Sequence, residues 1–206
     1  LIDKFVAKRL AEKTNRKGPD GKPTTVSAST INRELRYIKA ALRLARDWKY
    51  ITEVPRIRML KPLQKQPTYV SPEHFAAIYQ ACEVATIPGD IPNVTPCDWW
   101  RGLVVFLYMS GWRIGQTLAL KWDSVDLEAK TALTQAADNK GGRDDAIPLH
   151  PLMVDHLRLL SGSFSSHVFP WPKRIRVLWD EFAKIQGAAR MADGKPMPKR
   201  GKNGAW

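Results

Sequence analysis

The segment from Tyr108 to Asp126 constrains the fold more than any other, because it joins two apolar helical patterns through a turn that contains an arginine. The apolar run before the turn predicts a buried helix, and Gly111 follows where a helix end favours a residue that tolerates positive φ. Apolar residues after the turn predict a second, short helix. We therefore expect Arg113 to be pinned at the edge of the core, where its planar guanidinium could bind a phosphate through two hydrogen bonds.

This segment resembles the first conserved box of the tyrosine recombinases, the phage-integrase family of DNA strand-exchange enzymes. That box runs Gly-x-Arg, then an acidic residue three positions on, then Leu-x-Leu-x-Trp followed by aspartates around a branched aliphatic residue. The matching positions are Gly111, Arg113, Leu118, Leu120, Trp122, Asp123, Val125 and Asp126. One position departs from the pattern, because Gln116 stands where the family has the acid.

A second family pattern follows in the same order along the chain. The family has a β-hairpin that carries a lysine, then an arginine and a Val/Ile-Pro-Leu strand, and this sequence supplies Lys140, Arg143 and residues 147–149. The resemblance covers the chain from about Tyr69 onward, and more loosely the part before it. It agrees with the residue patterns in predicting a mainly α fold with a small antiparallel β-sheet (α+β), whose strands we expect near residues 125–127, 132–134 and 146–149.

The resemblance implies a transesterification that needs no cofactor. A tyrosine hydroxyl attacks a DNA phosphodiester and forms a 3′-phosphotyrosyl bond, which the 5′-hydroxyl of a partner strand later resolves. Arg113 matches the family arginine that grips the non-bridging oxygens, and Lys140 matches the lysine proposed as general acid. Gln116 is a supporting residue that can accept a hydrogen bond but cannot neutralise the charge of the arginine.

Other parts of the family set are missing from this sequence. There is no His-x-x-Arg box, and all five tyrosines precede Arg113. The sequence therefore contains no candidate nucleophile, and we expect this chain to bind DNA but not to cleave it. The chain resembles an excised fragment of a longer recombinase.

The residue patterns divide the chain into three parts. Residues 1–51 are expected to form a helical core-binding domain, incomplete at its N-terminus, in which the Gly- and Pro-containing stretch 14–27 is a mobile loop. Residues 52–68 contain three prolines among basic residues and are expected to form an extended linker. Residues 69–206 are expected to form a catalytic domain that is truncated at its C-terminus.

A strong amphipathic helix is predicted to start at Ser29 or Thr30. Its apolar residues recur every three or four positions, and its cations gather on a neighbouring flank that could follow a DNA backbone. Such a stripe is also typical of an ordinary solvated helix face. The predicted DNA-binding residues are Arg33, Arg36, Lys39, Arg43, Arg56, Arg58 and Arg143.

Composition agrees with a polyanionic partner. Lysine and arginine number 33 against 20 acids, giving a net charge of +13 and a pI near 9.9, and double-stranded DNA is the expected partner. The two cysteines and four scattered histidines predict neither a disulfide framework nor a metal site. No apolar run reaches membrane-spanning length, so we expect a cytoplasmic, nucleoid-associated protein of bacterial, phage or mobile-element origin. We expect this chain to be monomeric and its parent to be tetrameric on DNA.

Two other interpretations remain open at this point. The chain could be a non-catalytic DNA-binding protein on a recombinase scaffold, which Gln116 and the missing box would favour. It could also be a basic RNA-binding protein, although it lacks an obvious strand motif with exposed aromatics for stacking bases.

Overall fold

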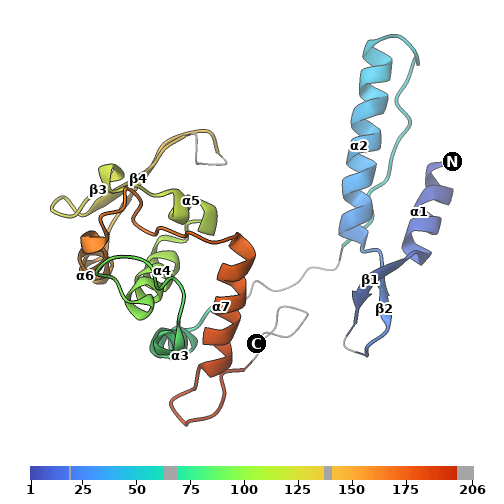
Figure 1. Cartoon of the computed structure of the whole chain (residues 1–206). Coiled ribbons are helices and arrows are strands. Elements are labelled where there is room, and N and C mark those ends of the chain that lie inside the picture. The colour runs from blue at the N-terminus through green and yellow to red at the C-terminus, as the bar shows by residue number, and fades with distance from the viewer. Residues whose placement is uncertain (19, 63–68, 137–140, 199–206) are drawn as a thin grey trace. The chain divides into compact units, whose positions relative to one another are not determined.

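Figure 1 shows the computed structural model of the chain. The described residues are 1–18, 20–62, 69–136 and 141–198. The chain divides into two compact units, one containing Leu1–Thr68 and the other formed by Tyr69–Pro198. Within the described ranges, every helix falls short of the length and apolar character that a bilayer-spanning helix requires.

The first unit is built on one long helix, α2 (Ala28–Asp47). The hydroxyl of Ser27 accepts a backbone N–H of its first turn, which explains why the helix starts here. The shorter α1 (Ile2–Ala11) packs against α2. Arg9 on α1 donates from Nε to an Oε of Glu34 on α2 at 2.9 Å, so an ion pair joins the two helices.

A β-hairpin connects these two helices. β1 (Lys13–Lys17) pairs antiparallel with β2 (Pro23–Thr25), and Gly21 adopts φ +76° at the tip. The prediction of a mobile loop over residues 14–27 is therefore wrong. Gly21 belongs to the turn of a hairpin, where its positive φ is a conformation that glycine adopts without strain.

Residues 52–62, the described part of the predicted linker, have no helix or strand but pack along α2 (Figure 1). The Asn32 side chain holds this segment by two hydrogen bonds of 2.8 Å, donating to the carbonyl of Leu60 and accepting its N–H. Ile57 is buried in the core of the unit. That core consists of Val26, Ile31, Leu35 and Ile57.

The second unit is centred on α4 (Pro96–Ser110), which is the most deeply buried helix of this unit. It packs against α3 (Pro72–Ala81) and most extensively against α6 (Pro151–Leu160). Gly102 allows that approach, because a Cβ at this position would lie 2.9 Å from Cδ1 of Leu160. The buried residues of α4 are Trp99, Trp100, Gly102, Leu103, Val104, Val105 and Phe106.

Two further helices complete the helical part of this unit, α5 (Ile114–Ala119) and α7 (Ile175–Ala188). The carboxylate of Glu181 anchors α7, since it accepts the N–H of Thr86 at 2.6 Å although the residue is only 7% exposed. Burial acts to raise the pKa of Glu181, but the hydrogen bonds from Thr86 and the charge of Lys184 outweigh it and the pKa is lowered. Single 3₁₀ turns lie at Cys82–Val84, Trp122–Ser124 and Ser161–Ser163.

A small antiparallel sheet lies beside these helices. It consists of β3 (Val125–Asp126), β4 (Thr131–Thr134) and β5 (Asp145–Pro148) in that order. β4 and β5 pair in a continuous register without a bulge, from Thr131 opposite Pro148 to Thr134 opposite Asp145. The predicted α+β fold, mainly helical with a small antiparallel sheet, is confirmed.

Candidate functional site

Arg113 occupies the junction between α4 and α5. Gly111 ends α4 with φ +66°, and its N–H bonds to the carbonyl of Leu107 at 3.1 Å. Arg113 is the N-cap residue of α5, whereas Trp112 before it is buried at 8% exposure. Arg113 itself is exposed, so the expectation that it is pinned at the edge of the core is wrong for its side chain. The turn directs Trp112 inward and leaves the arginine at the surface.

The backbone of Arg113 is nevertheless held from two sides. Its N–H donates to Oε1 of Gln116 at 3.1 Å, and its carbonyl accepts the N–H of Thr117 at 3.0 Å. Gln116 is 8% exposed and Thr117 is fully buried, so both partners are fixed by packing. The amide oxygen at position 116 thus caps the helix start, which a carboxylate could do equally well.

The β4–β5 hairpin approaches the same region. A small hollow is lined by Gln116 and Lys121 from the α5 region and by Thr134 and Gln135 at the end of β4. Arg143 is exposed just before β5. Lys140, the predicted general acid, lies outside the described residues. The end of β4 therefore lies close to Gln116, the residue that accepts the N–H of Arg113.

The predicted DNA-binding residues of the first unit lie on α2 and on the segment that returns along it. Lys39 and Arg43 on α2 and Arg56 on the returning segment line one hollow of about 390 Å³, together with Arg46. Arg46 is also ion-paired with Asp47 at 2.8 Å. Cations that lie close together repel one another, and a bound phosphate would offset this repulsion. The hollow therefore suits a phosphate of a DNA backbone.

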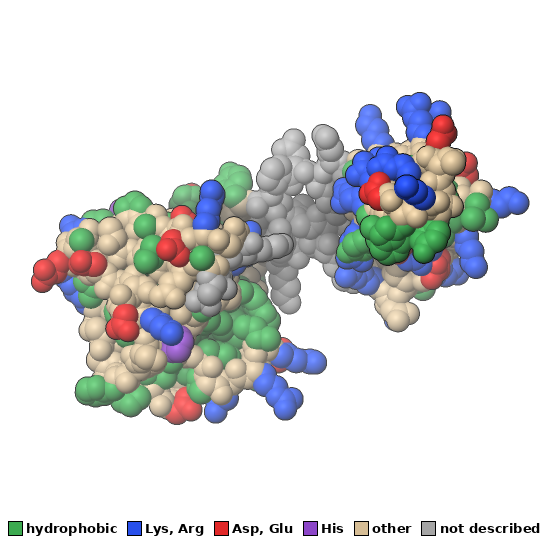
Figure 2. All heavy atoms as spheres, turned by 90° about the horizontal axis from the view of Figure 1, so that it is seen from above, with side chains coloured by type: hydrophobic (Ala, Val, Ile, Leu, Met, Phe, Trp, Pro, Cys, Tyr) green, Lys and Arg blue, Asp and Glu red, His purple; other side chains and the backbone are tan. Residues whose placement is uncertain are grey.

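The structure does not bring all the predicted cations into this hollow. Arg33, Arg36 and Arg58 are exposed but do not line it. Figure 2 shows Lys and Arg side chains projecting from several sides of this unit, with an apolar patch between them. Sequence reasoning found the helix stripe, but it gave no means of knowing which of these residues the returning segment would meet.

Charge is divided very unequally along the chain. Residues 1–68 contain 17 lysines and arginines against six acids, so they carry +11 of the net +13. Residues 69–206 contain 16 against 14 and carry the remaining +2. A polyanion is therefore attracted chiefly to the first unit.

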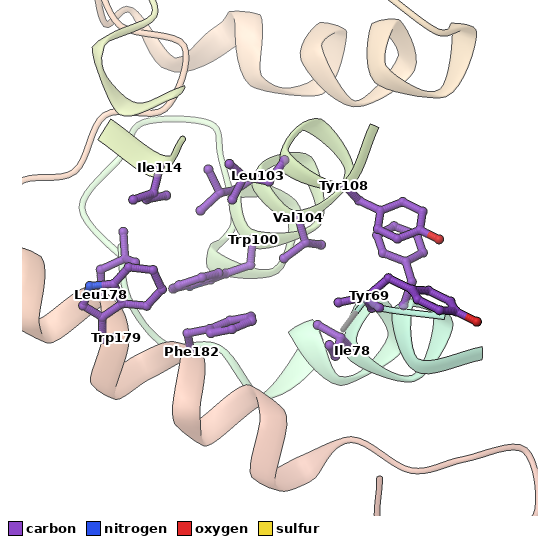
Figure 3. Close-up of a pocket in the computed structure, with 13 residues that line it drawn as sticks. Tyr69, Ile78, Trp100, Leu103, Val104, Tyr108, Ile114, Leu178, Trp179 and Phe182 are labelled. Carbon is purple, nitrogen blue, oxygen red and sulfur yellow. The ribbon is translucent and has the colours of Figure 1, made fainter. Parts of the chain in front are cut away.

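An apolar pocket lies in the second unit (Figure 3). It measures about 580 Å³ and is bordered by α3, α4 and α7, with the rings of Trp100 and Phe182 stacked 5.8 Å apart. Tyr69 and Tyr108 lie at the other end of it. Among the described residues, the lining of this pocket is apolar and aromatic and does not include Arg113.

Among residues 1–18, 20–62, 69–136 and 141–198, no three His, Cys, Asp or Glu side chains lie together in a way that could hold a metal ion.

Comparison with known proteins gives both sequence and structural relatives. No protein-family model matches the chain. The integrase of Salmonella phage P22 is 23% identical over 158 residues, which is 76% of this chain and 37% of the phage protein. Two structures of the Tn1549 transposon integrase in complex with circular-intermediate DNA match with TM-scores of 0.60 and 0.59, at 14% and 13% identity. They cover 86% of this chain and 63% and 64% of the integrase chains. The chain thus spans less than two thirds of the length of these relatives.

Proposed function

We propose a DNA-recombination function from the premise that this chain is a member of the tyrosine recombinase family, as its integrase-like sequence and its integrase fold support. The natural full-length protein binds duplex DNA and recombines or integrates it through a phosphotyrosine intermediate. This chain supplies DNA contacts and part of the catalytic set. The one observation that carries the proposal is the position of Arg113, exposed at a helix start whose backbone is fixed on both sides.

Arg113 is proposed to stabilise the extra negative charge of the reacting phosphate. Its guanidinium offers a planar set of donors, and Gln116 and Thr117 fix the backbone from which this side chain extends. Lys140, which follows β4 in the sequence, is proposed to protonate the leaving 5′-oxygen. Arg143 is proposed as a further DNA contact.

DNA binding by this chain is proposed to centre on the first unit. Lys39, Arg43 and Arg56 would hold backbone phosphates in the hollow beside α2, while Arg33, Arg36 and Arg58 contribute outside it. The chain alone is proposed to remain monomeric. It is also proposed not to cleave DNA, because every tyrosine in it precedes Arg113 and no His-x-x-Arg box is present.

A nicked suicide substrate tests the catalytic part in the natural full-length protein. Such a substrate traps the covalent intermediate, which survives denaturation as a protein–DNA band. We expect an adduct with the natural protein, and at least about a 100-fold lower rate with Arg113→Lys, since lysine cannot donate as a planar fork. Arg158→Lys on the exposed face of α6 is the matched control and should react normally.

The outcome also separates the second candidate, a non-catalytic DNA-binding protein on the same scaffold. Gln116 favours that candidate, since the amide cannot balance the charge of Arg113. Duplex binding by the full-length protein with no adduct would support it and would contradict the catalytic proposal.

A further inference from the structure

The β1–β2 hairpin of the first unit has no packing function that would explain it. Residues 13–25 contain no apolar side chain apart from prolines, and both strands are exposed along most of their length. An isolated two-stranded hairpin is marginally stable in water. A segment of this kind adds almost nothing to the hydrophobic stability of the unit, so its composition has to be explained by something else.

The hairpin is nevertheless well formed by local polar bonds. The hydroxyls of Thr14 and Thr24 lie 2.8 Å apart across the two strands. At the tip, the N–H of Gly18 bonds to the carbonyl of Lys22 at 2.7 Å. At the base, the N–H of Val26 bonds to the carbonyl of Glu12 at 3.1 Å, and Val26 itself is buried in the core. The hairpin is thus anchored at its base and exposed beyond it.

The exposed part of the hairpin is strongly basic. It contains one acid, Asp20, whose carboxylate accepts the N–H of Lys22 at 3.1 Å. Its four cations are all exposed, and they are Lys13, Arg16, Lys17 and Lys22. The nearby acids Glu12 and Glu34 are both bound by Arg9, which leaves the hairpin cations without them as partners.

We propose that the β1–β2 hairpin is a second DNA-binding element, which holds backbone phosphates through Arg16, Lys17 and the two flanking lysines. A two-stranded ribbon is narrow enough to lie against or within the major groove of duplex DNA. Four exposed cations on this ribbon give it a charge opposite to that of a duplex backbone. This inference rests on the proposed DNA-binding function and adds an element to the same interface.

The test removes the hairpin without touching the core. Because Lys13 and Thr25 are paired, residues 14–24 can be replaced by Asn-Gly, which closes a two-residue hairpin turn. A second variant, K13Q/R16Q/K17Q/K22Q, keeps the backbone. A matched control, K130Q/R158Q/R174Q/R176Q, removes the same charge from exposed positions of the second unit.

Each protein is titrated against a labelled duplex at several salt concentrations, and its hydroxyl-radical footprint is recorded. We expect both hairpin variants to lose at least tenfold in affinity and to lower the slope of log K against log salt by about 2 to 4, with one block of backbone protection lost. The control variant should keep the wild-type footprint and most of the wild-type slope of log K against log salt. Hairpin variants that bind as the wild type does, or a control with an equal loss, would overturn the proposal. Failure of the wild type itself to bind would instead contradict the proposed function.

Discussion

The side-chain oxygen of Gln116 caps the start of α5, and this role does not require a charge. It accepts the N–H of Arg113 at 3.1 Å from a buried position. The departure from the family pattern therefore leaves the helix start intact, and its effect is confined to the electrostatics around the arginine.

Substitution of Gln116 separates its capping of the helix from its effect on the electrostatics around Arg113. Gln116→Ala should lower the free energy of unfolding by about 1 kcal/mol, as loss of a helix cap does, and should weaken DNA strand cleavage by the full-length protein. Gln116→Glu should keep the cap and the stability. Chemical denaturation checks the first result, and unchanged stability in Gln116→Ala would contradict the capping role.

We expect His156 to make the stability of the second unit depend on pH. Burial is the main cause that lowers its pKa, and the charge of Arg101 lowers it further. The imidazole Nε2 lies 3.1 Å from the hydroxyl of Tyr79, inside the helical core. In the folded state the ring therefore stays neutral at a pH where an unfolded histidine, near 6.5, takes up a proton.

Because the unfolded state binds the extra proton, stability should be complete above about pH 6.5 and should fall as the pH drops below that value. Thermal unfolding between pH 7.5 and 5.5 measures the decline. His156→Gln should flatten it, although the variant starts from a lower Tm. An equally steep decline in His156→Gln would assign the effect to other groups.

Among the elements, the segment 52–62 determines the shape of the basic hollow. It has no regular structure, and its course is set by Asn32 and by the burial of Ile57. Without that course, Arg56 would not lie beside Lys39 and Arg43.

Asn32→Ala should release this segment. The change removes two hydrogen bonds to Leu60 and should cost about 1–3 kcal/mol in unfolding free energy, with faster hydrogen exchange at the Leu60 amide. DNA affinity should fall as well, because the hollow loses its second wall. Ser29→Ala, at an exposed position of the same helix, is the control. Unchanged exchange at Leu60 would contradict this account.

The sequence predicted some elements well because local signals specify them. The long helix expected from Ser29 or Thr30 is α2, which begins at Ala28, because a hydroxyl cap followed by apolar residues every three or four positions is a local signal. The hairpin at residues 13–25 was missed because glycine and proline signal a turn without saying whether strands flank it. The exposure of Arg113 and the meeting of Arg56 with α2 depend on contacts between distant residues, which a local pattern does not contain.

At the scale of the whole molecule, charge is divided unequally along the chain. Residues 1–68 carry +11, while the residues from Tyr69 onward carry +2 and contain the apolar groove beside Trp100 and Phe182. We therefore expect the first unit to attract the polyanion, whereas the second carries Arg113. This division agrees with an interface in which one unit supplies binding and the other supplies chemistry.

The most direct test of this account is fluorescence anisotropy of a labelled duplex titrated with this chain at several salt concentrations. We predict binding that weakens steeply with salt, and a slope reduced by about 2 to 3 in the variant K39Q/R43Q/R56Q. The control R158Q/R174Q/R176Q, which removes the same charge from the second unit, should bind nearly as the wild type does. Absence of binding at low salt, or equal losses in the two variants, would contradict the claim that the first unit holds DNA through this hollow.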